Sequence, residues 1–296
     1  MKRVLILAGP TASGKTELAI ELATAFDGEI VGADSRQVYR GMPIGTAAPS
    51  SDERALIPHH LIDFLDPAER YSAARYANDA VAAIERIHAR GRRAIVVGGT
   101  GFYIRALTGG VALAPQYDES VRARLANEAR RHDAEFLHAW LAVRDPQRAA
   151  MLPASDTYRV LRALEVALAP HAFRNGPATR TLRSAGIAFE TLYLEVEQQE
   201  LDARIAARTD GMLAAGLLEE AERIGADAVA ASAVGYPQAL AFLRGWCTQA
   251  ELRALLVRST RRYAKRQGTW FRSEPGVAHV ARRYAFAAAR EKLQWA

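Results

Sequence analysis

Cysteine is nearly absent from this 296-residue chain, in which Cys247 is the only one. A disulfide framework and a cysteine-based zinc site are therefore excluded. The sequence also lacks any stretch of about 18 apolar residues, so we expect no membrane-spanning helix. The apolar run near the start, "VLILA", is too short for the core of a signal peptide, so we expect a cytoplasmic protein.

Acidic residues are outnumbered: 39 Lys and Arg stand against 33 Asp and Glu, which gives a net charge of +6. Such a surplus favours a polyanionic partner, but it is weak support unless the positive charges cluster. Half of the residues are apolar and 24% are charged, which is ordinary for a globular protein. The length allows one large domain or two.

Short apolar strands alternate with helical patterns in the first hundred residues. This alternation predicts an α/β fold with a doubly wound parallel sheet. Ser72 is the expected N-cap of one helix, and Gly91 lies just past its end. The expected strands are 3–8, 29–33 and 93–99, and the expected helices are 16–26 and 72–90.

The pattern changes between residues 116 and 186, where three helical segments occur and no strand is evident. Strand character returns at 189–196. We therefore expect a core domain of residues 1–115 and 187–296 that carries an all-helical insertion, 116–186. Thr248 and Glu251 form a capping-box pattern at the start of a later helix, and 276–281 fits a last strand.

The stretch "GPTASGKT" follows the first expected strand and opens the first expected helix. This spacing and context predict a phosphate-binding loop, in which backbone N–H groups and the helix N-terminus surround an anion. Lys15 supplies a full positive charge and the Thr16 hydroxyl can hold Mg²⁺. The loop comprises Gly9, Pro10, Thr11, Ala12, Ser13, Gly14, Lys15 and Thr16.

The loop alone does not identify its ligand. A nucleoside triphosphatase normally has an acidic residue at the end of a neighbouring apolar strand. Here the obvious strand, 93–99, runs into "GGTG" instead, and Asp63 and Asp66 lie in a short segment that we expect at the sheet edge. The acidic partner is thus not where an ATPase would place it.

Asp34 follows the second expected strand, and Thr100 follows the third. Ligands of doubly wound sheets bind beyond the carboxyl ends of the strands, so both residues should face the phosphate loop. From its position alone, Asp34 is either a loop-capping residue or a catalytic group. The neighbouring Ser35, Arg36, Gln37 and Tyr39 offer hydrogen bonds, a cation and an aromatic ring, a set suited to a planar base.

Residues 258–272, "RSTRRYAKRQGTWFR", contain six basic residues and no acidic one, with Tyr263, Trp270 and Phe271 interleaved. The basic residues between 258 and 266 lie three to four apart and share one side of a helix. A solvated basic face is the commoner explanation for such a run. The aromatic residues and the absence of acids favour an RNA-binding face.

Five stretches, in the same order, resemble the tRNA dimethylallyltransferases, also called tRNA isopentenyltransferases: "GPTASGKT", "DSRQVYRGMPIGTA", "VGGTGFYIRAL", "RVLRALEV" and "AKRQGTWFR". The resemblance covers nearly the whole chain and indicates a bacterial type. It implies a P-loop core with a helical insertion that grips the anticodon arm. It also implies that the loop holds a prenyl diphosphate, with no need for ATP chemistry.

The activity implied by the resemblance is transfer of a dimethylallyl group from dimethylallyl diphosphate, with Mg²⁺ as cofactor. The acceptor is N6 of adenosine 37, 3′ of the anticodon, in tRNAs that read codons starting with U. Asp34 corresponds to the general base on the adenine amine, Thr100 to a diphosphate and tRNA contact, and Lys15 and Thr16 to the diphosphate and Mg²⁺ contacts. The implied tRNA-binding residues are Asp34, Ser35, Arg36, Gln37, Thr100, Arg122, Tyr158, Arg159, Arg162, Gly235, Tyr236, Lys265, Arg266, Gln267, Trp270 and Arg272.

The chain departs from the family pattern at two places. Ala48 replaces a lysine in "GTAAP", and "ALAPHAFRNGPATR" (167–180) replaces a "GKPLS"-like stretch. The cysteine count excludes the zinc finger of some eukaryotic relatives. Three alternatives fit the residues less well: an adenylate isopentenyltransferase, a P-loop kinase of small metabolites, and a non-enzymatic RNA-binding protein. The expected partners are tRNA and dimethylallyl diphosphate, and the expected state is a monomer.

Overall fold

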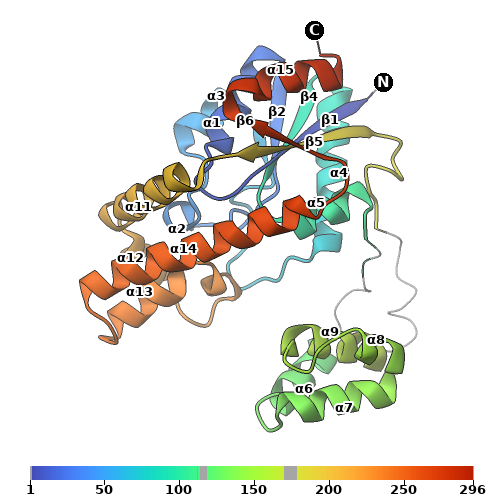
Figure 1. Ribbon diagram of the computed structural model, residues 1–296, viewed down its shortest axis with the longest axis vertical. Helices are drawn as coiled ribbons and strands as arrows, with labels where there is room; N and C mark the ends of the chain where they lie inside the picture. The colour runs from blue at the N-terminus through green and yellow to red at the C-terminus, as the bar shows by residue number, and fades with distance from the viewer. Residues whose placement is uncertain (1, 112, 114–118, 170–178, 296) are drawn as a thin grey trace. The chain divides into compact units, whose positions relative to one another are not determined.

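The computed structural model describes all residues except 1, 112, 114–118, 170–178 and 296 (Figure 1). The chain divides into two compact units: unit 1 is Met1–Val111 with Arg180–Ala296, and unit 2 is Ala112–Thr179. The return to unit 1 therefore comes at residue 180 rather than at 187. The reason is local: the Leu182 N–H donates to the Leu107 carbonyl at 2.7 Å, and Leu182 is fully buried.

Unit 1 is a six-stranded sheet covered by helices on both faces. Its elements are β1 (Arg3–Ala8), α1 (Lys15–Ala25), β2 (Gly28–Gly32), α2 (Pro43–Thr46), α3 (Ser51–Leu56), β3 (His59–His60), α4 (Ala73–Ala89), β4 (Arg93–Gly98), α5 (Gly101–Thr108), β5 (Ala188–Glu195), α11 (Gln198–Ala214), α12 (Leu217–Ile224), the 3₁₀ turn η1 (Val229–Ser232), α13 (Tyr236–Leu243), α14 (Gln249–Arg272), β6 (Val277–Ala281) and α15 (Arg282–Leu293).

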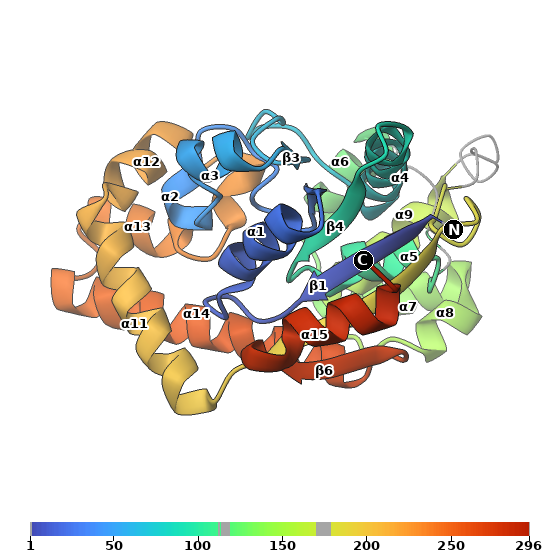
Figure 2. The same cartoon turned by 90° about the horizontal axis from the view of Figure 1, so that it is seen from above.

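The strand order is β3-β2-β4-β1-β5-β6, and every pair is parallel. Figure 2 shows α1 and α15 in front of the strands and α5 behind them. Because helices cover both faces, the central strand β1 is apolar and buried almost throughout. The doubly wound parallel sheet is confirmed, and the segment that contains Asp63 follows the edge strand β3, as expected.

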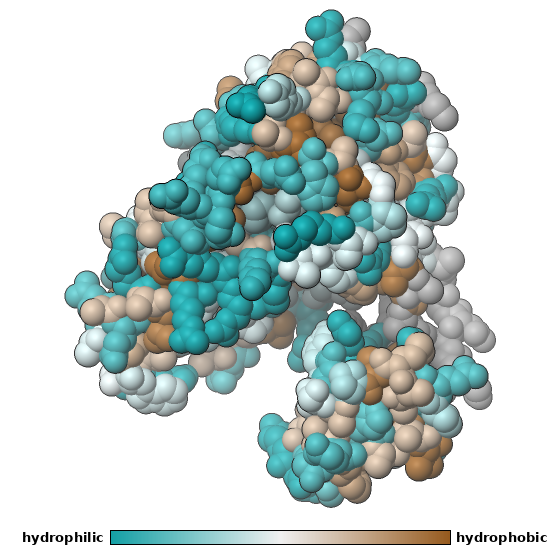
Figure 3. Space-filling view, in the orientation of Figure 1, coloured by the Kyte–Doolittle hydropathy of each residue, from teal (hydrophilic) through white to brown (hydrophobic). Residues whose placement is uncertain are grey.

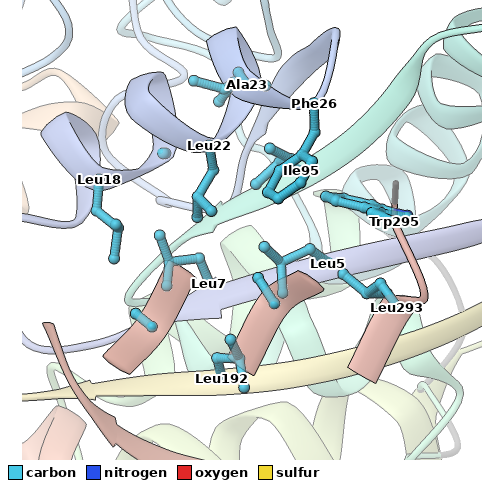
Figure 4. Packing of buried hydrophobic residues seen from close by; sticks show 14 of the residues in the cluster. Leu5, Leu7, Leu18, Leu22, Ala23, Phe26, Ile95, Leu192, Leu293 and Trp295 are labelled. Carbon is cyan, nitrogen blue, oxygen red and sulfur yellow. The ribbon is translucent and has the colours of Figure 1, made fainter. Parts of the chain in front are cut away.

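The main apolar core lies between the sheet and the helices α1 and α15. Figure 4 shows Leu5, Leu7 and Leu192 of the strands packing against Leu18 and Leu22 of α1 and Leu293 at the end of α15. A second apolar cluster joins α12, α13 and α14 and includes Leu217, Tyr236 and Leu256. Both predicted helix caps occur: Ser72 accepts from the Arg75 N–H, and Thr248 and Glu251 form the capping box.

Unit 2 is all helical over its described residues and packs around its own apolar cluster, which includes Leu137, Leu141 and Val160. The altered stretch 167–180 falls largely on residues 170–178, outside the described residues. Among the helices that the structure describes, none is long and apolar enough to cross a membrane. The helices of unit 2 are α6 (Glu119–Glu128), α7 (Ala134–Arg144), α8 (Pro146–Ala150) and α9 (Thr157–Leu168).

Candidate active site

The predicted site residues meet at one edge of the sheet because three strands end in register there. Ala8, the last residue of β1, pairs with Gly98, the last residue of β4. Gly32, the last residue of β2, pairs with Val97. The phosphate loop, the turn after β2 and the turn after β4 therefore leave the sheet side by side.

The phosphate loop follows β1 directly, and its last two residues, Lys15 and Thr16, begin α1. Gly14, the N-cap of α1, has a φ of +84°, a left-handed conformation that glycine adopts without a steric penalty. The Lys15 ammonium donates to the Pro10 carbonyl at 2.7 Å, which folds the side chain back across its own loop. Ser13 is 1% exposed.

The Lys15 ammonium lies in a poorly solvated position. Burial lowers the pKa of Lys15 from its ordinary 10.5 to about 8; the Asp34 carboxylate opposes the shift, and the Arg208 guanidinium adds to it. Lys15 is incompletely hydrated and has a second cation, Arg208, nearby. A multivalent anion would bind well here, because its negative charge replaces the stabilisation that water gives to an exposed ammonium.

The turns that carry Asp34 and Thr100 are tied to each other. The Thr100 N–H donates to the Ala33 carbonyl at 3.2 Å, and the Thr100 hydroxyl accepts from the Ser35 N–H at 3.0 Å. Gly98 permits this approach, since a Cβ there would overlap the backbone of Ala33. Thr100 thus fixes the backbone on both sides of Asp34.

Asp34 combines the two roles that its position allows. One oxygen, Oδ1, accepts from the Arg36 N–H at 2.8 Å and caps the local turn. Within the described part of the chain, the other oxygen, Oδ2, takes no hydrogen bond, so it can accept a proton from a ligand. The side chain lines a cavity of about 220 Å³.

The polar wall of this cavity brings together groups from four segments. Arg208 of α11 is a functional candidate that the sequence reasoning missed. Tyr263 of α14, expected on an RNA-binding face, lines this cavity instead. Burial lowers the pKa of Arg208 and raises the pKa of Tyr263. The second largest influence on each is the Asp34 carboxylate, which raises both pKa values. The polar lining includes Thr11, Asp34, Ser35, Arg36, Arg208 and Arg266.

The same cavity also has an apolar lining, which comes from α11, α12, α14 and the turn before α13. The cavity volume is below the range of about 300–1,000 Å³ typical of sites for drug-sized ligands, and suits a small group. A cavity lined by both charged and apolar side chains fits an amphiphilic ligand with an anionic head. The apolar lining includes Ile205, Met212, Leu217, Ala233, Val234 and Leu256.

A buried carboxylate supports α2, whose residues Gly45 and Thr46 line this cavity. Glu220, 1% exposed, accepts from the Ile44 N–H at 2.9 Å, the Gly45 N–H at 2.7 Å and the Tyr236 hydroxyl at 2.7 Å. The Arg208 guanidinium donates to the Thr46 carbonyl at 3.4 Å. Glu220 also escaped the sequence reasoning, because an acidic residue on an amphipathic helix ordinarily faces water.

Several residues predicted to bind tRNA or a base are internal. Tyr236 is fully buried, and Tyr39, 5% exposed, donates its hydroxyl to the Glu69 carbonyl. The expectation that the Tyr39 ring is available to a planar base is therefore wrong, because the ring packs in the second apolar cluster. Gln37 donates to the Thr46 and Ala47 carbonyls. Gln267 is 5% exposed.

Other predicted tRNA-binding residues lie at the surface. The outer face of α14 exposes five basic residues between 258 and 266, and Figure 3 shows hydrophilic residues gathered over α11 and α14. Lys265 and Arg272 line a larger cavity, of about 710 Å³, which also contacts Pro10 and Ser13. Gly235 lines the smaller cavity. The five basic residues are Arg258, Arg261, Arg262, Lys265 and Arg266.

In unit 2, the predicted residues divide in the same way. Tyr158 is 70% exposed, and Arg159 is exposed beside Asp156. Arg122 and Arg162 both lie against Glu165, at 3.7 and 2.9 Å, and Glu165 is 4% exposed. These two arginines hold a buried carboxylate and keep only part of their guanidinium surface open.

The comparisons with known proteins agree with this arrangement. The family model for IPP transferase matches residues 37–274. The chain belongs to this family. It is 44% identical to a tRNA dimethylallyltransferase of Geobacter sulfurreducens over 288 residues, covering 94% of this chain and 91% of that protein. It is 46% identical to one from Anaeromyxobacter sp. over 285 residues, covering 95% of both.

Solved structures of the same family share the fold. A tRNA isopentenylpyrophosphate transferase from Bacillus halodurans has a TM-score of 0.70 and 34% identity, with 99% of this chain and 96% of that chain covered. A eukaryotic dimethylallyltransferase acting on tRNA has a TM-score of 0.77 and 26% identity, with 99% and 78% covered. The fold of this chain therefore has experimental counterparts over almost its whole length.

Proposed function

We propose that the chain transfers a dimethylallyl group from dimethylallyl diphosphate to N6 of adenosine 37 in tRNAs that read codons starting with U. One observation carries this proposal: a single cavity holds the Asp34 carboxylate, the Arg208 guanidinium beside the phosphate loop, and an apolar wall. The relatives named tRNA dimethylallyltransferase support it. The phosphate loop then serves a diphosphate leaving group rather than a nucleoside triphosphate.

The cations beside the phosphate loop would stabilise the leaving group. As the bond between the allylic carbon and the diphosphate oxygen breaks, negative charge grows on the diphosphate. Lys15, Arg208 and the loop N–H groups would stabilise this charge, and the effect is strong where the cations are poorly solvated. The apolar wall holds the five-carbon tail and keeps water from the allylic carbon.

The acceptor amine requires a base. The N6 lone pair of adenine is delocalised into the ring, so N6 must lose a proton as its bond to the allylic carbon forms. Asp34 Oδ2 accepts that proton, and Thr100 holds the Asp34 turn in place through the Ser35 N–H. A positioned base of this kind contributes about 10²–10⁴-fold to the rate.

The donor atoms beside the loop are compatible with Mg²⁺. No group of three or more His, Cys, Asp or Glu gathers in the described part of the chain. Mg²⁺ does not need one, because it binds through one or two protein oxygens, substrate phosphates and water. We infer that the Thr16 hydroxyl, on the first turn of α1, would hold it. When bound, the ion would neutralise part of the diphosphate charge.

The macromolecular partner that we propose is the anticodon stem-loop of tRNA. The exposed basic face of α14 supports this, since Arg258, Arg262, Lys265 and Arg266 are exposed on it. To hold an adenine outside the stacked anticodon loop, the protein must bind the phosphates on either side of that adenine. We also propose that the enzyme works as a monomer in the cytoplasm, because one chain supplies both walls of the cavity and tRNA is the substrate.

The experiment that tests this function offers radiolabelled dimethylallyl diphosphate and Mg²⁺ to the protein with unmodified tRNA or with AMP. Label on tRNA alone is the expected result. Label on AMP would favour an adenylate isopentenyltransferase. Label on neither acceptor would refute prenyl transfer.

A further inference from the structure

The inner face of α14 docks on the turn between β4 and α5 at two glycines. A Cβ at Gly99 would overlap the Gln267 amide, and a Cβ at Gly101 would overlap the Trp270 ring. Trp270 is held in place by the Arg105 guanidinium, 4.1 Å from the ring centroid. The two glycines thus bring α14 against the turn that carries Thr100.

Gln267 joins this turn to the phosphate loop by two hydrogen bonds. Its amide oxygen accepts from the Thr11 N–H at 2.8 Å, and its amide nitrogen donates to the Gly99 carbonyl at 3.0 Å. Thr11 is a loop residue that lines the cavity, and Gly99 directly precedes Thr100. A neutral amide provides the donor and the acceptor that this bridge needs.

Burial makes the bridge costly to break. Gln267 is 5% exposed and its bond to the Gly99 carbonyl is buried, so removing its amide leaves that carbonyl with no replacement from bulk water. The exposed basic residues lie on the other side of the helix, whereas the Gln267 side chain is directed inward at the loop. Because the amide is buried and bonded to the loop and to Gly99, it does not lie on the exposed basic face of α14.

We propose that Gln267 is a positioning residue for the transfer reaction. It holds the Thr11 amide of the phosphate loop at a fixed place relative to Thr100, so that the diphosphate and the Asp34 base are in register. This inference rests on the proposed function and assigns Gln267 a role other than the tRNA contact that the family resemblance implies.

The first test replaces Gln267 by methionine, which keeps the length of the side chain and deletes both hydrogen bonds. Binding of inorganic diphosphate with Mg²⁺ is measured by calorimetry, and tRNA binding by filter retention. We expect the diphosphate Kd to rise about tenfold or more and the tRNA Kd to change less than about threefold. The kcat should fall as well, because the loop and Thr100 lose their register.

The second test uses Gln267→Glu, whose protonated carboxyl has one donor and one acceptor like the amide. Its ionised form repels the Gly99 carbonyl, and burial raises the pKa of a carboxyl. We expect this variant to bind diphosphate best at low pH and to lose affinity, relative to wild type, as the pH rises. A purely structural contribution to folding would not produce this new pH dependence.

Gln238→Met is the matched control, since Gln238 accepts from the Gly235 N–H and donates to the Ser259 hydroxyl, both at 3.0 Å. It should lower the melting temperature and leave the diphosphate Kd unchanged. An unchanged diphosphate Kd in Gln267→Met, or a loss confined to tRNA affinity, would overturn the positioning role. If wild type itself binds no diphosphate, the proposed function is refuted, and this inference with it.

Discussion

Replacing Asp34 by asparagine separates its two roles. The Asn side-chain oxygen can still accept from the Arg36 N–H, as Asp34 Oδ1 does at 2.8 Å, so the turn should keep its shape. The amide has no basic oxygen for the N6 proton. We therefore expect kcat to fall by about 10²–10⁴-fold, with tRNA affinity changed less than about threefold.

The choice of pH decides how cleanly this effect is seen. The Asp34 carboxylate raises the pKa of Lys15, which burial has lowered to about 8. Replacing the Asp34 carboxylate by an amide lowers the pKa of Lys15 further, so the variant should bind diphosphate more weakly above neutral pH. A single-turnover assay with saturating dimethylallyl diphosphate, at a pH about one and a half units below the Lys15 pKa, keeps Lys15 charged and isolates the loss of the base.

Asp66→Asn is the matched control, because Asp66 Oδ1 accepts from the Ala68 N–H at 2.8 Å in the same kind of turn, away from the cavity lining. It should retain wild-type kcat. Retention of more than about a tenth of the single-turnover rate by Asp34→Asn would remove Asp34 from the role of base.

Three further outcomes follow from the site. The kcat/KM for dimethylallyl diphosphate should fall as pH rises through about 8, since only the protonated form of Lys15 pairs with the anion; a profile flat to well above that pH would contradict this. Lys265→Ala combined with Arg266→Ala should weaken tRNA binding and reduce its salt slope by about 1–2, and an unchanged slope would mean that this face does not meet phosphate. Glu220→Gln should lower the free energy of unfolding in urea by about 2 kcal/mol and raise the KM for the donor, because Glu220 holds the Ile44 and Gly45 amides; unchanged stability would refute its supporting role.

The sequence predicted the phosphate loop, Asp34 and Thr100 as neighbours because the geometry of parallel strands requires it. Residues that follow adjacent strands meet at one edge, and the register of Ala8 with Gly98 and of Gly32 with Val97 produces that result. The "GGTG" turn was visible as a motif. The reason for its glycines, which is the close approach of Ala33 and of α14 to this turn, could not be read from the sequence.

Burial on the helices could not be read from the sequence in the same way. Arg208 and Glu220 lie on amphipathic helices, where a charged residue ordinarily points to water, and only tertiary packing turns them inward. Tyr236 and Gln267 belong to motifs shared with the family, and a shared motif does not distinguish a surface contact from an internal support. One sequence signal could have identified Gln267 as internal. It lies three and four positions from the apolar residues Ala264 and Phe271, and therefore shares their buried face of α14.

We propose that this chain modifies N6 of one adenosine beside the anticodon. The most direct measurement is mass spectrometry of nucleosides from an anticodon stem-loop RNA after reaction with dimethylallyl diphosphate and Mg²⁺, beside the same RNA with guanosine at position 37. We expect N6-(dimethylallyl)adenosine from the first RNA and no prenylated nucleoside from the second. Prenylation of both RNAs, or of neither while free AMP is modified, would contradict the proposed function.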